Sequence, residues 1–204
     1  MSPSLARRVV LATGNPGKLA EMRAILASHG LAVVAQSDFR IEPPVENGAS
    51  FVANALLKAR HAAAVSGLPA IADDSGLEVD ALGGRPGLHT ARYAGPAADD
   101  RANNDKLLAE LAGVPMPRRS ARYRCAMVFV RDAADRSPLI AEASWSGSIG
   151  FEPRGAGGFG YDPLFVVAGA CRTAAEMPAA EKNRVSHRGQ ALMALAAEMR
   201  NAGW

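Results

Sequence analysis

Short apolar runs alternate with helix-length segments along the first half of the sequence, and this alternation constrains the fold more than any other feature. Val9–Ala12 is an apolar run ended by the turn-forming residues Thr13–Gly17, which indicates a buried strand followed by a tight turn. A helix is expected from about Lys18 to His29, because apolar residues recur along it at helical spacing and a glycine follows. Leu31–Ala35 predicts a second strand.

The same signals place the remaining elements. They predict a helix from about Phe51 to Val65, a strand at Ala70–Ala72, a helix from about Asp99 to Leu111, a hairpin of the strands Tyr123–Val130 and Ile140–Ser148, a strand at Leu164–Val167, and a last helix from about Ser186. Strands and helices that alternate and are then followed by a hairpin predict an α/β fold, with a mixed, twisted β-sheet that carries helices on both faces.

Length and charge limit the classes of protein that the chain can belong to. Its 204 residues suit one domain or one domain with two lobes, so we expect a single domain over residues 1–204. The net charge of +3 permits an anionic ligand but does not favour a nucleic-acid partner. The one dense basic run, Arg118–Arg124, is expected to be a solvated loop leading into a strand.

Neither a leader nor a membrane segment is expected. Met1–Arg8 is followed by a short strand-like run and not by a long apolar helix, so we expect a cytoplasmic protein without a membrane partner. Cys125 is expected in the core and Cys171 in a loop, and their spacing is not that of a metal site.

The first candidate site is the turn Thr13–Lys18. A glycine turn at a helix start presents backbone N–H groups and the positive end of the helix dipole, and Lys18 adds a full charge, which together favour an anion. The spacing is not that of a Walker A loop. A plain strand-to-helix turn explains this segment equally well.

Paired carboxylates form the second candidate site. Asp73 and Asp74 follow directly on the apolar run Ala70–Ala72, and two carboxylates at the end of a buried strand are costly unless a cation lies nearby. Mg²⁺ favours one or two carboxylates together with phosphate oxygens, so the pair suits a magnesium–nucleotide site, with Glu46 as a possible third carboxylate. The alternative is an acidic turn, with Glu46 as an ordinary acid near a helix start.

Two later segments could bind a nucleotide. Gly157–Pro163 combines glycines, which let a backbone approach a ligand, with aromatic side chains that can stack on a base. Lys182–Gly189 gathers cationic and titratable side chains at a helix start, where an anion or a base carbonyl would relieve the conflict with the helix dipole. For Gly157–Pro163 the alternative is a tight turn whose aromatic side chains belong to the core. For His187, a role in binding is as consistent as a role in catalysis.

These segments, in this order, resemble the non-canonical purine NTP pyrophosphatases, also called ITP/XTP pyrophosphatases or the HAM1-like family. Six matching pieces run from residue 13 to residue 189: Thr13–Lys18; Glu46–Gly48 with Phe51 and Lys58–Arg60; Ala72–Leu77; Pro86–Gly87 with Ala91–Gly95; Gly157–Pro163; and Ser186–Gly189. One departure is visible. Thr90 stands where relatives commonly have serine, and the hydroxyl is kept.

The resemblance implies an elongated two-lobed domain with a central cleft, usually a homodimer, that acts on a small-molecule nucleotide with Mg²⁺ as cofactor. It implies that Glu46 and Asp74 bind the metal, with Asp73 as a possible further ligand, and that Asp74 is the catalytic proton acceptor. The residues implied to contact the substrate are Thr13, Gly14, Asn15, Pro16, Gly17, Lys18, Lys58, Ser75, Phe159, Gly160, Tyr161, Asp162, Lys182, His187 and Arg188.

The expected reaction converts ITP, dITP or XTP to the monophosphate and pyrophosphate. Asp74 accepts a proton from the water that attacks the α-phosphorus, and Mg²⁺ neutralises charge in the transition state. Three alternatives stay open: a Maf-like nucleotide pyrophosphatase with another base preference, a nucleotide sensor without activity, and a nucleic-acid-binding protein. A panel of ITP, XTP, dTTP and UTP tests for the Maf-like enzyme. Release of pyrophosphate excludes the sensor, and salt-dependent DNA binding would indicate the nucleic-acid-binding protein.

Overall fold

A mixed six-stranded sheet runs through the computed structural model, which describes residues 7–27 and 30–204. The strands are β1 (Arg7–Leu11), β2 (Leu31–Ala35), β3 (Ala70–Val79), β4 (Ser120–Val130), β5 (Leu139–Ile149) and β6 (Phe165–Val167). Their order in the sheet is β2-β1-β3-β4-β5-β6. β1 pairs in parallel with β2 and β3, whereas β5 and β6 are antiparallel, so the expected mixed α/β fold is confirmed.

The α-helices of the described residues are α1 (Pro16–Leu26), α2 (Phe51–Ser66), α3 (Asp100–Glu110), α4 (Ala179–Val185) and α5 (His187–Asn201). Asn15, Ser50 and Asp99 cap α1, α2 and α3 by accepting a hydrogen bond from a backbone N–H of the first turn. The expected end of the first helix, at His29, lies outside the described residues. Over the two described ranges, no helix combines the length and the apolar character needed to cross a bilayer.

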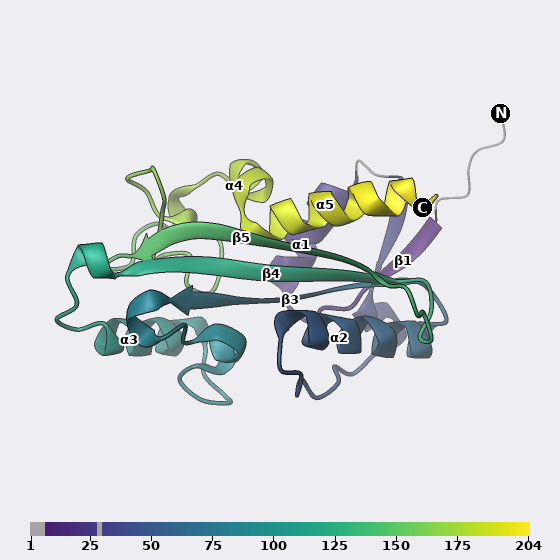
Figure 1. Cartoon of the computed structure of the whole chain (residues 1–204), viewed down its shortest axis with the longest axis horizontal. Coiled ribbons are helices and arrows are strands. Elements are labelled where there is room, and N and C mark those ends of the chain that lie inside the picture. Colours follow the sequence, from purple (N-terminus) through teal and green to yellow (C-terminus); the bar gives the residue numbers. More distant parts are fainter. Residues whose placement is uncertain (1–6, 28–29) are drawn as a thin grey trace. The chain divides into compact units, whose positions relative to one another are not determined.

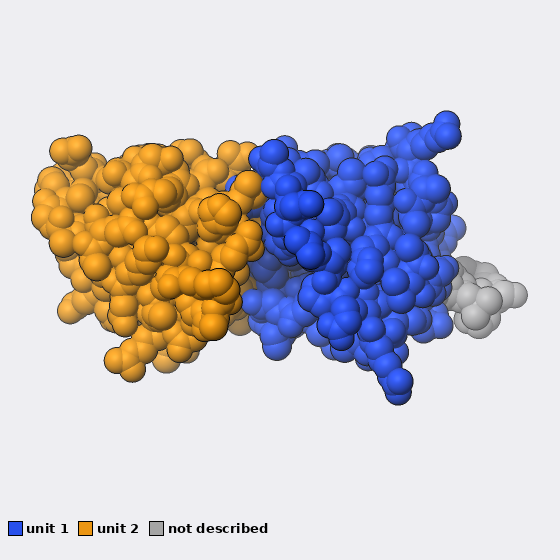
Figure 2. Space-filling view, turned by 90° about the horizontal axis from the view of Figure 1, so that it is seen from below, with its two compact units in different colours: residues 1–74, 125–143, 188–204 blue, residues 75–124, 144–187 orange. Residues whose placement is uncertain are grey.

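The chain divides into two compact units (Figure 2). Unit 1 comprises the described part of Met1–Asp74 together with Cys125–Ala143 and Arg188–Trp204, and unit 2 comprises Ser75–Arg124 and Ser144–His187. The expectation of one domain with a central cleft stays a prediction.

Strand periodicity builds two separate cores in unit 1. Successive strand residues point to opposite faces of a sheet, so Val9 and Leu11 pack with α1 and α5, whereas Val10 and Ala12 pack with α2. β3 follows the same rule, with Ile71 in the first core and Ala70 and Ala72 in the second. Figure 1 shows α1 and α5 along one face of the strands and α2 along the other. Helices therefore cover both faces, as expected.

Unit 2 has an aromatic core. The rings of Tyr123, Trp145 and Phe165 contact one another. Leu107 of α3 and Leu111, which follows the end of that helix, belong to the same buried cluster. Rings in tilted or stacked contact add stability beyond the area that they bury.

The basic run Arg118–Arg124 is not the solvated loop that its composition suggests. Arg119 is 2% exposed, and its guanidinium donates hydrogen bonds to the carbonyl oxygens of Leu111, Ile149 and Gly150. Arg122 is paired with Glu78. For Arg119 the expectation of solvation was wrong, because backbone carbonyls surround its guanidinium. Arg122 keeps a 42% exposed side chain but lies in β4 and not in a loop.

The cysteines lie where they were expected. Cys125 is buried and Cys171 exposed. Burial raises the pKa of the Cys125 thiol to about 12, so this thiol stays protonated at neutral pH.

We expect the Asp135→Asn variant to be less stable than the wild type by about 1–3 kcal/mol at neutral pH. The Asp135 carboxylate closes the β4–β5 turn by accepting hydrogen bonds from the backbone N–H groups of Arg131 and Ser137, each at 2.9 Å. Burial alone would raise its pKa, but these two N–H groups and the charge of Arg131 lower it. A depressed pKa contributes stability above the unfolded-state value, and this contribution is lost as the pH falls through the folded value.

Urea denaturation at pH 7 and again below pH 4 measures this effect. The stability gap between variant and wild type should shrink in acid. Asp132→Asn, a change in the same turn at an exposed carboxylate, is the control. A gap that stays constant or widens in acid contradicts the prediction.

Candidate active site

The two neighbouring aspartates lie inside β3 and not at its end. The expectation that the strand stops at Ala72 was wrong, since β3 continues to Val79. Asp, Ser and Gly favour turns, but partners on adjacent strands and helices override that local preference. Because side chains alternate along a strand, Asp73 points toward α1 and α5 and Asp74 points toward α2.

Asp73 lies between two cations. The Lys18 ammonium is 2.8 Å from Asp73 Oδ2, and Arg188 Nε is 3.4 Å from the same oxygen. Glu21 holds Arg188 from the other side, with 2.6 Å between Oε2 and Nη1. Burial alone would raise the pKa of Asp73, but Lys18 and Arg188 hold it well below its usual range. Asp73 is therefore a permanent anion that orients two cationic side chains.

Asp74 has a different environment. Its Oδ2 accepts a hydrogen bond at 3.0 Å from Asn54 Nδ2, and its Oδ1 lies 3.3 Å from Lys58 Nζ. Burial raises the pKa of Asp74, although Lys58, Lys18 and Asn54 oppose the rise. Glu46 Oε1 is 3.0 Å from the same Lys58 ammonium. A buried carboxylate with a raised pKa is a better proton acceptor than a free one.

The turn before α1 is shorter than expected, because the helix begins at Pro16 and not at Lys18. Asn15 is the N-cap and accepts a hydrogen bond from Lys18 N at 3.1 Å, and Thr13 Oγ1 accepts one from Asn15 N at 3.2 Å. Pro16 occupies the first turn of α1, where its missing N–H costs nothing. The helix start thus lies in the same unit as Asp73, and Lys18 joins the two.

Glu46 and Asp74 fit a divalent cation. Both carboxylates lie within ion-pair distance of one ammonium, that of Lys58, so both can face a single cation. Carboxylate oxygens are the ligands that Mg²⁺ prefers. Within residues 7–27 and 30–204, no group of three His, Cys, Asp or Glu side chains lies close enough to hold a metal ion. This pair therefore fits a cation whose other ligands are phosphate oxygens and water.

A second cluster, in unit 2, gathers the predicted residues of the glycine-rich segment. Lys182 Nζ is 2.5 Å from Asp162 Oδ2, and both side chains are almost fully buried. Asp162 also accepts hydrogen bonds from Phe159 N and from the Tyr123 hydroxyl, and Lys182 lies 4.9 Å from the centroid of the Phe159 ring. His187 stacks on the Tyr123 ring, with 4.6 Å between centroids and 8° between planes.

The other predicted residues of unit 2 are placed as follows. Tyr161 is 2% exposed and donates its hydroxyl to the Thr90 carbonyl, so its ring belongs to the core. Ser75 lies in β3 and is half-buried. A side chain at Gly158 would meet Asp162 Oδ2 at 2.1 Å, which explains why glycine is needed there. The Thr90 hydroxyl accepts a hydrogen bond from Leu77 N, a contact that serine could also make.

Three residues of these clusters were missed by sequence reasoning. Asn54 holds Asp74, Glu21 holds Arg188, and Tyr123 contacts both Asp162 and His187. Asn54 lies four residues before Lys58 on α2, a spacing that places both side chains on one helix face and could have revealed it.

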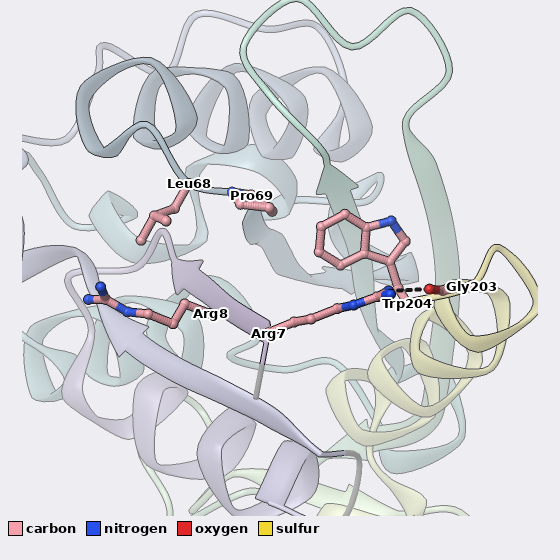
Figure 3. Close-up of a pocket in the computed structure, with 6 residues that line it drawn as sticks. All are labelled: Arg7, Arg8, Leu68, Pro69, Gly203 and Trp204. Atoms are coloured by element: carbon pink, nitrogen blue, oxygen red, sulfur yellow. Dashed lines mark hydrogen bonds between the residues drawn. The ribbon is translucent and has the colours of Figure 1, made fainter. Parts of the chain in front are cut away.

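A surface pocket of unit 1 contains none of the predicted residues. It is lined by Arg7, Arg8, Leu68, Pro69, Gly203 and Trp204 (Figure 3). Arg7 points toward the C-terminus, donates to the Gly203 carbonyl and lies 5.1 Å from the centroid of the Trp204 ring. These contacts tie the end of the chain to β1, a structural role.

The comparison with known proteins covers nearly the whole chain. Residues 9–198 match the Ham1 family. The chain belongs to the Ham1 family. A curated Ham1 relative from Methylococcus capsulatus, named dITP/XTP pyrophosphatase, is 59% identical over 96% of this chain and 98% of its own length. A relative of the same name from Yersinia pseudotuberculosis is 53% identical over 96% of this chain and 100% of its own length.

Solved Ham1 structures have the same fold. The HAM1 protein from Coxiella burnetii superimposes with a TM-score of 0.87 at 44% identity and covers 96% of this chain and 99% of its own. The nucleoside-triphosphatase / dITP/XTP pyrophosphatase from Mycobacterium abscessus has a TM-score of 0.73 at 45% identity and covers 92% of this chain and 97% of its own.

Proposed function

We propose that this protein hydrolyses non-canonical purine nucleoside triphosphates, namely ITP, dITP and XTP, to the monophosphate and pyrophosphate, and so removes them from the nucleotide pool. One observation carries the proposal. In a chain of the Ham1 family, Asp74 and Glu46 both lie within ion-pair distance of the Lys58 ammonium, and Asp73, the residue before Asp74, pairs with Lys18 at a helix start suited to an anion. The names of the curated relatives support the same activity.

Asp74 acts as the general base. It accepts a proton from the water whose oxygen attacks the α-phosphorus, and the bond between that phosphorus and the bridging oxygen breaks to release pyrophosphate. Asn54 donates to one carboxylate oxygen and Lys58 pairs with the other, which keeps the carboxylate fixed. Burial raises its pKa, which favours proton transfer from water.

The phosphates are bound by the turn from Thr13 to Lys18, and Asp73 orients the Lys18 ammonium. Arg188, which Asp73 also holds, is assigned to the nucleotide near its base, as the family resemblance implies. Glu46 and Asp74 would hold Mg²⁺, which when bound would neutralise the charge on the phosphate oxygens. Asp73 is committed to Lys18 and Arg188 on the opposite face of β3, so we assign it this orienting role in preference to metal binding.

The base is bound by unit 2. The Phe159 ring offers a stacking surface, while Lys182 and His187 offer hydrogen bonds. A site built around a 6-keto oxygen leaves buried groups unpaired when a 6-amino group arrives, and this penalises ATP. The proposal extends to Ser75 and to the backbone of Gly160 and Tyr161 as further substrate contacts.

The test is incubation with ITP and Mg²⁺, followed by separation of the products. IMP with pyrophosphate supports the proposal, whereas IDP with orthophosphate contradicts it. Binding of ITP without turnover also contradicts the proposal and indicates a nucleotide sensor without catalytic activity. XTP, dTTP and UTP run in parallel separate purine from pyrimidine preference.

We also propose that the protein is a cytoplasmic homodimer, as the family resemblance implies, with no nucleic-acid or membrane partner. Light scattering on the eluted protein should then give twice the 21.2 kDa mass of the chain. A mass of one chain at micromolar concentration contradicts the dimer.

A further inference from the structure

Helix α3 holds the turn Phe159–Asp162 through two contacts to Gly160, one to its N–H and one to its carbonyl. Gly160 N donates a hydrogen bond at 2.6 Å to Asp100 Oδ2, and Asn104 Nδ2 donates one at 2.9 Å to the Gly160 carbonyl. Asp100 and Asn104 are four residues apart on α3, so they share a helix face. Both peptide groups that flank Gly160 are therefore fixed by side chains from another element.

The turn's own contacts hold Phe159 and Asp162 but not Gly160. Asp162 N donates to the Phe159 carbonyl at 3.3 Å, and Phe159 N donates to Asp162 Oδ2 at 3.0 Å. Gly160 lies between these residues with a φ of +63°, and glycine has several accessible backbone conformations of similar energy. The contacts from α3 supply the restraint at Gly160, directly after Phe159.

Asn104 makes its contact at a cost. Its Oδ1 is buried and finds no hydrogen-bond partner among the described residues. An unsatisfied buried acceptor is unfavourable, and an apolar side chain of similar shape would avoid it. The amide is explained by its bond to the Gly160 carbonyl.

We propose that Asp100 and Asn104 are positioning residues for base recognition: by fixing Gly160, they hold Phe159 where it stacks on the purine. This inference rests on the proposed function, which assigns the base to the turn. It makes substrate affinity depend on a helix that carries none of the predicted site residues.

Asp100→Ala and Asn104→Ala test the proposal. Each should raise KM for ITP by about fivefold to thirtyfold, the range that one hydrogen bond to a charged or buried group spans, and leave kcat within about twofold. Asp100→Asn retains an acceptor oxygen for Gly160 N and should restore KM. Selectivity for ITP over ATP should fall in the two alanine variants, because a mobile ring discriminates less.

Two controls on the same helix separate positioning from stability. Asp99→Ala removes the N-cap of α3 and should lower the unfolding free energy by about 1 kcal/mol, but it leaves both contacts to Gly160. Asp105→Ala removes an exposed carboxylate paired with Arg101. Both controls should keep the wild-type KM.

Each outcome decides the matter. A rise in KM for Asp100→Ala and Asn104→Ala but not for the controls supports the proposal. An unchanged KM, a fall in kcat alone, or an equal rise in Asp99→Ala overturns it. If the wild type itself does not hydrolyse ITP, the proposed function fails. If the wild type is active and the two alanine variants keep its KM, only the positioning role is overturned. Should Asp100→Ala not fold, Asn104→Ala alone gives the same decision.

Discussion

Asp74→Asn is expected to lower kcat for ITP hydrolysis by about 10²- to 10⁴-fold or more, the usual cost of removing a positioned general base. The asparagine amide has nearly the same shape but cannot accept the proton of the attacking water. Its oxygen can still face Asn54 Nδ2 or Lys58, so the surroundings lose little support. The fold should survive, and the loss should appear in kcat more than in KM.

Steady-state kinetics at saturating Mg²⁺, with circular dichroism of each variant, measure this effect. Asp38→Asn is the control, because it changes a carboxylate of the same unit whose Oδ2 accepts only the Ala35 backbone N–H among the contacts described for it. A kcat for Asp74→Asn within a few-fold of wild type removes Asp74 from the role of base. A variant that fails to fold is replaced by Asp74→Ser, a smaller polar residue that also lacks the base.

Lys182→Met should lower the unfolding free energy by about 3–5 kcal/mol, the typical cost of breaking a buried ion pair by removing one partner. Lys182 and Asp162 are 4% and 3% exposed, and their charged atoms are 2.5 Å apart. Without the ammonium, the partners left to the Asp162 carboxylate among the described residues are Phe159 N and the Tyr123 hydroxyl. An uncompensated buried charge is the reason for the large loss.

The double variant Lys182→Met with Asp162→Asn tests that reason. It removes both charges, so it should be more stable than Lys182→Met alone. Lys106→Met is the control, because its side chain is 41% exposed and lies in the same unit. Urea denaturation gives the three free energies. If Lys182→Met lowers the unfolding free energy no more than Lys106→Met does, the prediction for the buried ion pair is contradicted.

Most of the fold could be predicted because the pattern of apolar residues is local. Val9–Ala12 and Leu31–Ala35 were expected as strands and are β1 and β2 to within two residues. The course of β3 through Asp73 and Asp74 could not be predicted. Its turn-forming residues are held in an extended conformation by partners from other elements. The short helix α4 was missed for a related reason, since seven residues give too little periodicity.

Some candidate site residues named from separate segments lie together in the fold, and their roles stay predictions. Lys18, Asp73 and Arg188 were named from separate segments, and the fold brings them together. Glu21 was not named, because a glutamate on a helix is an ordinary surface residue until a distant partner is known. Asn54 was overlooked, although its spacing from Lys58 places both side chains on one helix face. Arg188 is 167 residues from Glu21, and no local pattern records such a contact.

The alternation along β3 has a chemical consequence. Asp73 and Asp74 are joined by one peptide bond, yet their side chains lie on opposite faces of the sheet. On one face two cations lower the pKa of Asp73, and on the other face burial raises the pKa of Asp74. Sliding the strand by a single position would exchange the two faces. Asp74, the proposed proton acceptor, would then point toward Lys18 and Arg188, and Asp73 would point toward α2 but out of register with Asn54 and Lys58. Loss of one residue upstream in β3 should therefore abolish turnover even in a chain that still folds.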